Sequence, residues 1–171
     1  KKKFVIYETN SVVGRVNKFF LNSSTKIFTG YPLKNLNISN DKVTFVGQLI
    51  REQIYLAKVN NYFKKDDNFD FTLLIIGGSQ GAEIFSKTLP QSLNKLFNLN
   101  KKIRIFHQVG NKEQELKIDF SYKNNPNVVF FNFEPNIEKY MMLSDLVITR
   151  AGSSTLSELA YLQIPFIAIP F

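Results

Sequence analysis

The chain has 171 residues, a formal net charge of +8 and no cysteine. This length suits one domain or parts of two, and without cysteine the chain forms neither a disulfide nor a thiolate metal site. No apolar run reaches the roughly 18–20 residues that a transmembrane helix needs. The lysine clusters are short and are not interleaved with aromatic residues, so we expect no nucleic-acid partner, while an anionic membrane surface stays open as a partner.

The first part of the chain predicts a small set of strands and helices. Strands are expected at residues 3–7, 25–29 and 42–46, and helices at 14–21 and 53–63. A charged tract at 64–68 then interrupts the pattern and is a candidate domain boundary. The chain opens on a strand without Met and ends on an apolar strand, so we expect it to be an internal segment of a longer protein.

Strands and helices alternate closely from residue 71 onwards. Strands are predicted at 71–76, 102–107, 127–131, 145–148 and 166–169, and helices at 81–97 with a kink at Pro90, 112–117, 136–143 and 153–162. Short apolar strands separated by helices are typical of a parallel sheet that is covered on both faces. The predicted fold class is therefore α/β.

The most informative segment is 149–158, where a glycine turn opens a helix through Ser153, Ser154 and Thr155. The first helical turn leaves backbone N–H groups unpaired, and its dipole favours negative charge. Small residues there let an anion approach the backbone closely. Glu158, one turn later, is placed to accept hydrogen bonds from sugar hydroxyls. The segment predicts a site for a nucleotide diphosphate or a nucleotide sugar.

A second glycine-rich loop, residues 77–82, directly follows the strand predicted at 71–76. A strand–loop–helix unit places its donors at the carboxyl end of a sheet, where open α/β folds bind ligands. We read the loop as a diphosphate cradle to which Ser79 adds a hydroxyl. The alternative is a tight turn that needs glycine for its backbone shape alone. The loop matches neither the Walker pattern nor G-x-G-x-x-G.

Three single residues allow a functional and a structural interpretation. His107, the only histidine, is read as a structural residue bonded to backbone rather than as a base or metal ligand. Arg51 reaches either a phosphate or carboxylate in a cleft, or solvent. Asn10 either bonds a sugar hydroxyl or shapes a turn. The sequence presents no carboxylate pair of the glycosidase type, no metal site and no cofactor motif.

Five motifs, taken in order, give the chain a family resemblance. They are Tyr7-Glu8-Thr9-Asn10-Ser11, Val46-Gly47-Gln48-Leu49-Ile50-Arg51, Gly77-Gly78-Ser79-Gln80-Gly81-Ala82, His107-Gln108-Val109-Gly110, and Arg150-Ala151-Gly152 through Glu158. Over essentially its whole length the chain resembles the MurG-type transferases. These are the bacterial UDP-N-acetylglucosamine:undecaprenyl-pyrophosphoryl-MurNAc-pentapeptide N-acetylglucosaminyltransferases.

The resemblance implies a GT-B fold of two Rossmann-like domains with parallel sheets, both incomplete in this segment. Residues 1–50 would be the latter part of the amino-terminal, acceptor-side domain. Residues 51–171 would be most of the carboxy-terminal, UDP-GlcNAc-binding domain. The implied enzyme is an inverting transferase that moves GlcNAc from UDP-GlcNAc to undecaprenyl-linked MurNAc-pentapeptide in peptidoglycan synthesis. It would need no metal and lie peripherally on the cytoplasmic face of the bacterial cell membrane, and this segment alone would be inactive.

The resemblance also implies roles for individual residues. Asn10 would touch the GlcNAc group, Arg51 and Ser79 the donor near its diphosphate, and the backbone at Glu134 the uracil. The start of the last helix would hold the diphosphate and the ribose through the residues Ser153, Ser154, Thr155, Leu156, Ser157 and Glu158. The resemblance identifies no catalytic base.

The chain departs from the family pattern at several positions. The family usually has His, Gln and Asn-Pro in place of Tyr7, Thr9 and Gln48-Leu49, and a small aliphatic residue in place of Glu134. Two other interpretations therefore stay open. One is a different GT-B enzyme, such as a glycolipid glycosyltransferase, and the other is a non-catalytic remnant that binds a nucleotide sugar.

Overall fold

The structure, a computed structural model, describes residues 2–33, 40–111, 113, 115 and 117–170, without the side chains of residues 40 and 78–82. The chain divides into two compact units, Lys1–Ile50 and Arg51–Phe171, and each is described by itself. The charged tract at 64–68 lies inside the second unit and is not the boundary between the units.

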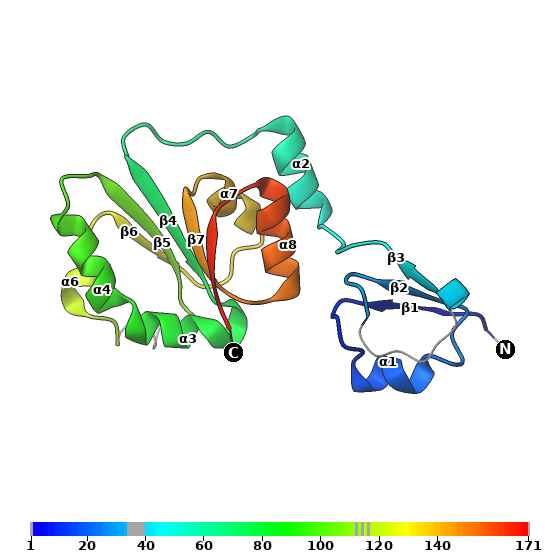
Figure 1. The fold of residues 1–171 in the computed structure, drawn as a ribbon. Helices are drawn as coiled ribbons and strands as arrows, with labels where there is room; N and C mark the ends of the chain where they lie inside the picture. Colours follow the sequence, from blue (N-terminus) through cyan, green and yellow to red (C-terminus); the bar gives the residue numbers. More distant parts are fainter. Residues whose placement is uncertain (1, 34–39, 112, 114, 116, 171) are drawn as a thin grey trace. The chain divides into compact units, whose positions relative to one another are not determined.

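The first unit is a three-stranded parallel sheet in the order β1-β2-β3 (Figure 1). Its elements are β1 (Val5–Glu8), α1 (Arg15–Phe20), β2 (Lys26–Thr29), the short 3-10 helix η1 (Asn40–Lys42) and β3 (Val43–Phe45). Ile6, Leu21 and Ile27 form its small buried core. The strands predicted at 3–7, 25–29 and 42–46 are therefore present, each shorter than predicted.

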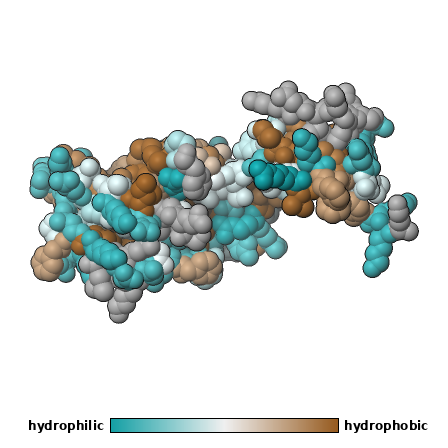
Figure 2. All heavy atoms as spheres, turned by 90° about the horizontal axis from the view of Figure 1, so that it is seen from below, coloured by the Kyte–Doolittle hydropathy of each residue, from teal (hydrophilic) through white to brown (hydrophobic). Residues whose placement is uncertain are grey.

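Several apolar side chains of the first unit reach the surface. Among them are Phe4, Val12, Val16, Phe19 and Phe20, and Phe19 is 80% exposed. Figure 2 shows hydrophobic atoms at the surface among hydrophilic ones. The interior of this unit is therefore small compared with the apolar surface that it leaves in water.

The second unit contains a five-stranded parallel sheet in the order β6-β5-β4-β7-β8. Its strands are β4 (Phe71–Ile76), β5 (Ile103–Gln108), β6 (Val128–Phe131), β7 (Leu146–Arg150) and β8 (Phe166–Ile169). The first strand, β4, lies at the centre because the chain winds outward from it in both directions. Such a doubly wound order brings the carboxyl ends of β4 and β7 side by side.

Helices cover both faces of this sheet, with α3, α4 and α6 on one side and α2, α7 and α8 on the other (Figure 1). The helices are α2 (Glu52–Asn60), α3 (Gly78–Thr88), α4 (Pro90–Asn94), α6 (Phe120–Lys123), α7 (Ile137–Met142) and α8 (Ser153–Leu162), with the 3-10 helix η2 (Lys95–Asn98). Because both faces are covered, β4 is largely buried, and apart from Thr72 it reads as a continuous apolar run.

The main core lies between the sheet and the helices α3, α4 and α6. Leu73 and Ile75 of β4 point into it and pack with Phe85, Leu93 and Tyr122 from the three helices. Leu74 and Ile76 alternate to the opposite face, where they are also buried. The sheet is therefore held rigidly from both sides at the level of its central strand.

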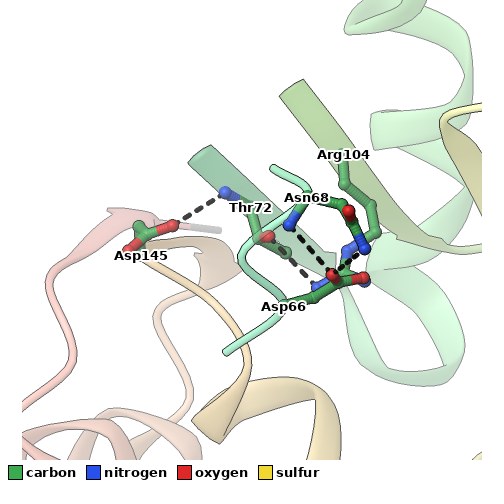
Figure 3. A network of polar contacts seen from close by, with 5 residues as sticks. All are labelled: Asp66, Asn68, Thr72, Arg104 and Asp145. Carbon is green, nitrogen blue, oxygen red and sulfur yellow. Dashed lines mark hydrogen bonds and ion pairs between the residues drawn. The ribbon is translucent and has the colours of Figure 1, made fainter. Parts of the chain in front are cut away.

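A polar network closes the amino edge of the sheet (Figure 3). The Arg104 guanidinium pairs with the Asp66 carboxylate at 3.0 Å and lies over the ring of Phe69 at 4.6 Å. The Asp145 carboxylate accepts a hydrogen bond from the backbone N–H of Thr72 at 2.8 Å. The segment that leads into β4 is thus fixed to the starts of β5 and β7.

The predicted α/β class with parallel sheets is confirmed, and most element positions agree within two residues. α3 ends at Thr88 and Pro90 begins α4, where the sequence predicted a single helix with a kink. The short helix α6 was not predicted, and the helix predicted at 112–117 lies partly outside the described residues. The sequence also predicts a polar loop at 35–41, and most of that range lies outside the described residues as well.

Candidate functional site

The candidate site lies at the carboxyl edge of the five-stranded sheet. Ile76 of β4 pairs with Thr149 of β7, so both strands end at the same edge. Gly77 then leads into α3, and Gly152 leads into α8. Two helix N-termini therefore open beside each other, each with the positive end of its dipole at this edge. The sequence predicted this pair of strand-to-helix junctions.

An open pocket of about 180 Å³ lies at this edge. Its apolar walls come from Ile76, Ile137 and Met141. Its polar and aromatic lining comes from Arg51, Gln108, Phe133, Glu134, Thr149 and Thr155. Mostly apolar walls with a few convergent polar groups are typical of small-molecule sites.

Arg51 and Glu158 form an ion pair beside this pocket. Nε of Arg51 lies 2.6 Å from Oε1 of Glu158, and Nη2 lies 2.8 Å from Oε2. The Glu158 side chain is 4% exposed and the Arg51 side chain 47% exposed. Hydrogen bonding to Glu158, only partly opposed by burial, raises the pKa of Arg51, and the charges of Glu158 and Glu138 add to this. The guanidinium is therefore a permanent cation at the pocket.

This pair affects the role predicted for Glu158 as an acceptor for ribose hydroxyls. Both carboxylate oxygens are already hydrogen-bonded to Arg51. An ionised carboxylate has about four acceptor positions, so ribose hydroxyls would use those that remain or take the place of the guanidinium. The sequence brought both residues into the site and left a carboxylate open as a partner of Arg51, but it did not indicate that this carboxylate is Glu158.

The start of α8 has unpaired backbone donors, as predicted for a diphosphate site. The first intrahelical bond runs from the N–H of Leu156 to the carbonyl of Gly152. The N–H groups of Ser153, Ser154 and Thr155 precede it and have no acceptor within the helix. No side chain caps this terminus, and the space beside Gly152 is open. Thr155 lines the pocket, whereas Leu156 and Ser157 follow it along α8.

The second glycine-rich loop forms the first turn of α3, because the helix begins at Gly78. Ser79 lies in this turn, and its side chain lies outside the described residues. The backbone N–H of Gly77 donates to Oε1 of Gln108 at 3.1 Å. The loop is therefore connected to the end of β5, a contact that the sequence did not indicate.

Glu134 follows the exposed ring of Phe133 in the loop between β6 and α7. Oε1 of Glu134 accepts a hydrogen bond from the N–H of Asn136 at 2.9 Å. Phe133 is 84% exposed although it lines the pocket. An exposed aromatic ring at a pocket rim provides a flat apolar surface for a ring of a ligand. The sequence analysis gave no site role to Phe133 or Thr149, although each follows a predicted strand.

His107 points away from this pocket into the core. Its side chain is fully buried, and Nδ1 lies 3.0 Å from the hydroxyl of Tyr122. The ring also packs against Phe130. Burial lowers the pKa of His107 to about 4, so the ring is neutral at neutral pH. The structural interpretation holds, but the partner is a tyrosine side chain and not backbone.

Asn10 lies in the first unit, in the turn after β1. Glu8 is buried there and accepts hydrogen bonds from Nδ2 of Asn17 at 2.9 Å, from the N–H of Gly14 at 3.0 Å, and from the N–H of Asn10 at 3.0 Å. Burial acts to raise the pKa of Glu8, but these bonds together lower it. Nδ2 of Asn10 also donates to Glu8 at 3.2 Å, so Glu8 fixes the exposed amide of Asn10.

Two other kinds of feature, a cluster of metal ligands and a membrane-spanning helix, are absent from the described part of the chain. No three histidine, cysteine or carboxylate side chains there come together as metal ligands. Among the helices of the described residues, none is long and apolar enough to cross a membrane.

Comparison with known proteins gives a family match over more than half of the chain. Residues 72–171 match the glycosyltransferase family 28 C-terminal domain. This range runs from β4 through β8 and includes both strand-to-helix junctions. The match therefore covers all of the pocket lining except Arg51.

Curated relatives match nearly the whole chain. One from Rickettsia felis is 38% identical over 97% of this chain and 48% of its own length. One from Pelagibacter ubique is 36% identical over 98% of this chain and 46% of its own length. Both are named UDP-N-acetylglucosamine--N-acetylmuramyl-(pentapeptide) pyrophosphoryl-undecaprenol N-acetylglucosamine transferase. The chain spans about half the length of the curated relatives it matches.

Solved structures share the fold. MurG of Acinetobacter baumannii has a TM-score of 0.69 at 24% identity, over 99% of this chain and 46% of that one. The glycosyltransferase of kitacinnamycin has a TM-score of 0.60 at 16% identity, over 88% and 37% of the two chains. At these identities the likeness concerns the fold alone, and it agrees with the predicted GT-B class.

Proposed function

We propose, from the premise that this chain belongs to glycosyltransferase family 28, that its second unit binds the UDP portion of a nucleotide sugar. The observation that carries the proposal is the pair of helix N-termini at one sheet edge, beside a pocket that contains the Arg51 cation. Unpaired N–H groups and a guanidinium are the donors that a diphosphate needs. The motif-based family prediction is confirmed by the match over 72–171.

The whole protein is proposed to transfer GlcNAc from UDP-GlcNAc to undecaprenyl-linked MurNAc-pentapeptide in peptidoglycan synthesis. The names of the curated relatives support this reaction. Negative charge develops on UDP as the sugar leaves, and the helix dipoles at Gly77 and Gly152 are directed at the place where that charge forms. In this proposal the second unit is the donor-binding domain, the first unit belongs to the acceptor-side domain, and this segment alone is inactive.

Each predicted site residue has a place in this proposal. Arg51 and the amides of Ser153, Ser154 and Thr155 contact the diphosphate. The backbone at Glu134 meets the uracil beside the Phe133 ring. Ser79, Leu156 and Ser157 belong to the two helix starts, Glu158 accepts from the ribose, and Asn10 contacts the GlcNAc group on the acceptor side.

The membrane-bound acceptor favours peripheral attachment of the whole protein at the cytoplasmic face of the cell membrane. The net charge of +8 supports this, because anionic lipids attract basic surfaces. We therefore propose an anionic membrane surface as a partner.

Titration of the full-length protein with nucleotide sugars tests the proposed function. We expect UDP-GlcNAc to bind more tightly than other nucleotide sugars. Replacing Glu158 with Ala should weaken UDP-GlcNAc binding by about 1–3 kcal/mol, the loss typical of hydrogen bonds to a charged group. Calorimetry measures this change directly.

The matched control is Glu113→Ala, which removes a carboxylate from an exposed pair with Lys117. It should leave UDP-GlcNAc affinity unchanged. An affinity that is the same for wild type and Glu158→Ala would contradict the ribose role. No binding of UDP-GlcNAc to the folded wild-type protein would contradict the proposed function itself.

A further inference from the structure

Gln108 connects two loops that border the candidate site. Its Oε1 accepts a hydrogen bond from the N–H of Gly77, and its Nε2 donates to the carbonyl of Asn132, each at 3.1 Å. Gly77 begins the turn into α3, and Asn132 directly precedes Phe133 and Glu134. One side chain therefore holds both the diphosphate side and the base side of the pocket.

The chemistry of both contacts fixes the orientation of the amide. The backbone N–H of Gly77 needs an acceptor, and the carbonyl of Asn132 needs a donor. A glutamine amide provides one acceptor and one donor in a rigid plane. The reverse orientation would place its NH2 group against the N–H of Gly77 and its oxygen against the carbonyl of Asn132. No other uncharged side chain of this length provides both groups, so the position is chemically specific.

The alternation of β5 explains why Gln108 reaches the site. Successive side chains of a strand point to opposite faces, so His107 enters the core and Gln108 faces the pocket that it lines. β5 also lies between β4 and β6 in the sheet. A side chain at its carboxyl end can therefore bond to the loops after both neighbours, as Gln108 does.

We propose that Gln108 is a positioning residue that couples recognition of the base to recognition of the diphosphate. This inference rests on the proposed function, in which the amides after β4 face the diphosphate and the loop after β6 faces the uracil. With Gln108 in place, a ligand meets two loops that are already held at a fixed separation. Binding then costs less ordering of either loop.

The test measures the affinities of the full-length protein for UDP and CDP. The two ligands carry the same diphosphate and differ only in the base, so their Kd ratio reports the base-side loop. Gln108→Met keeps the length of the side chain and removes both hydrogen bonds. We expect Kd for UDP to rise about tenfold and the preference for UDP over CDP to fall about threefold.

Gln108→Glu separates the two contacts. The carboxylate still accepts from Gly77 but presents an acceptor to the Asn132 carbonyl, which repels the base-side loop. The added charge affects the binding of UDP and CDP equally, so it does not change the ratio of their Kd values. We expect the preference for UDP to fall in this variant as well.

The matched control is Asn94→Leu. Nδ2 of Asn94 donates to Oδ1 of Asp119 at 3.0 Å and to Oγ of Ser121 at 2.7 Å, a polar link between α4 and α6 that does not line the pocket. It should change neither Kd nor the UDP-to-CDP ratio, whatever it does to the unfolding temperature. If Gln108 had a structural role alone, Gln108→Met would behave like Asn94→Leu.

Three outcomes overturn the inference while leaving the proposed function in place. Gln108→Met could bind UDP as tightly as wild type, could lose UDP and CDP affinity by the same factor, or could match the control. If the wild-type protein binds no UDP, or does not prefer it to CDP, it is the proposed function that fails.

Discussion

At the residue scale, the Arg51–Glu158 pair shows how a binding group is held before its ligand arrives. The two residues are 107 positions apart in sequence, yet both nitrogens of a guanidinium edge meet both oxygens of one carboxylate. Bidentate geometry fixes the guanidinium more firmly than a single contact does. Neither residue type nor spacing predicts such a pair, because it depends on how α2 packs against α8.

Arg51→Met should lower the free energy of unfolding of the second unit. It leaves the Glu158 carboxylate buried without its counter-charge. Breaking a fully buried pair costs about 3–5 kcal/mol, and we expect about 2 kcal/mol here because Arg51 is half exposed. Urea unfolding measures the loss. Adding Glu158→Gln to this variant should restore part of it, since a neutral amide tolerates burial better, and no recovery would contradict this account.

His107 should make the second unit less stable in acid. Its pKa is about 4 in the folded chain and 6.5 in the unfolded reference. The neutral ring therefore contributes its full stability above pH 6.5, and this contribution is lost as pH falls from 6.5 towards 4. The loss amounts to about 3 kcal/mol at its largest.

Urea unfolding between pH 7 and pH 4 measures this dependence. His107→Leu should show a shallower decline over the same range, because only the carboxylates common to both proteins still titrate. Equal slopes for the two proteins would show that protonation of His107 is not linked to unfolding.

At the element scale, the sequence predicted the strands well, because a strand that is buried on both faces is a mostly apolar run that is easily recognised. The run Phe71–Ile76 is apolar except for Thr72, is bounded by Asp70 and Gly77, and forms β4 at the predicted residues. The α8 helix likewise begins at Ser153 and ends at Leu162 as predicted. Local composition was sufficient in both cases.

Other elements depend on contacts that the local sequence does not contain. The four-residue helix α6 is too short for a periodic pattern; it is held by an Asp119 cap at its start and by the buried ring of Tyr122. Pro90 was expected to bend a helix, but it serves as the first residue of α4, where its missing N–H costs nothing. The Gln108 bridge required knowing that β5 lies between β4 and β6.

In the first unit, the residues at which the chain departs from the family pattern lie close together and are hydrogen-bonded. The hydroxyl of Tyr7 donates to the carbonyl of Gly47 and accepts from the N–H of Leu49, each at 3.0 Å. Nε2 of Gln48 donates to the carbonyl of Thr9 at 2.6 Å. Residues that looked like separate substitutions in sequence therefore form one polar cluster between the ends of β1 and β3.

Asp145→Ala should loosen the amino edge of the sheet. Asp145 is the acceptor for the N–H of buried Thr72, so its removal leaves that donor unpaired. An unsatisfied buried donor costs about 1–3 kcal/mol. Hydrogen exchange should be faster at the Thr72 amide. Asp145→Asn keeps an acceptor oxygen and should lose less; an equal loss in both variants would point to charge rather than to this bond.

At the scale of the whole molecule, the two units differ greatly in the size of their cores. The first has a buried cluster of Ile6, Leu21 and Ile27, whereas the second has a cluster shared by three strands and three helices. Stability grows with the apolar surface that a unit buries. Each unit should therefore respond separately to denaturant.

The first unit should unfold at a lower urea concentration than the second. Amide exchange at Ile27 and Leu74, which are buried in β2 and β4, reports the two units separately. Added UDP should raise the midpoint of the second unit alone, because a ligand stabilises only what it binds. A single coincident transition, shifted as a whole by UDP, would contradict this prediction.

The five-stranded sheet has chemically different ends: helix starts and an open pocket at one, and the closed Asp66–Arg104 network at the other. A library of random variants screened only for soluble yield would retain Arg104 and Asp145 and accumulate changes at Ser154 and Phe133. A screen for the proposed UDP binding would retain both groups. Comparing the two screens would therefore separate, position by position, what keeps this protein folded from what makes it useful to a cell.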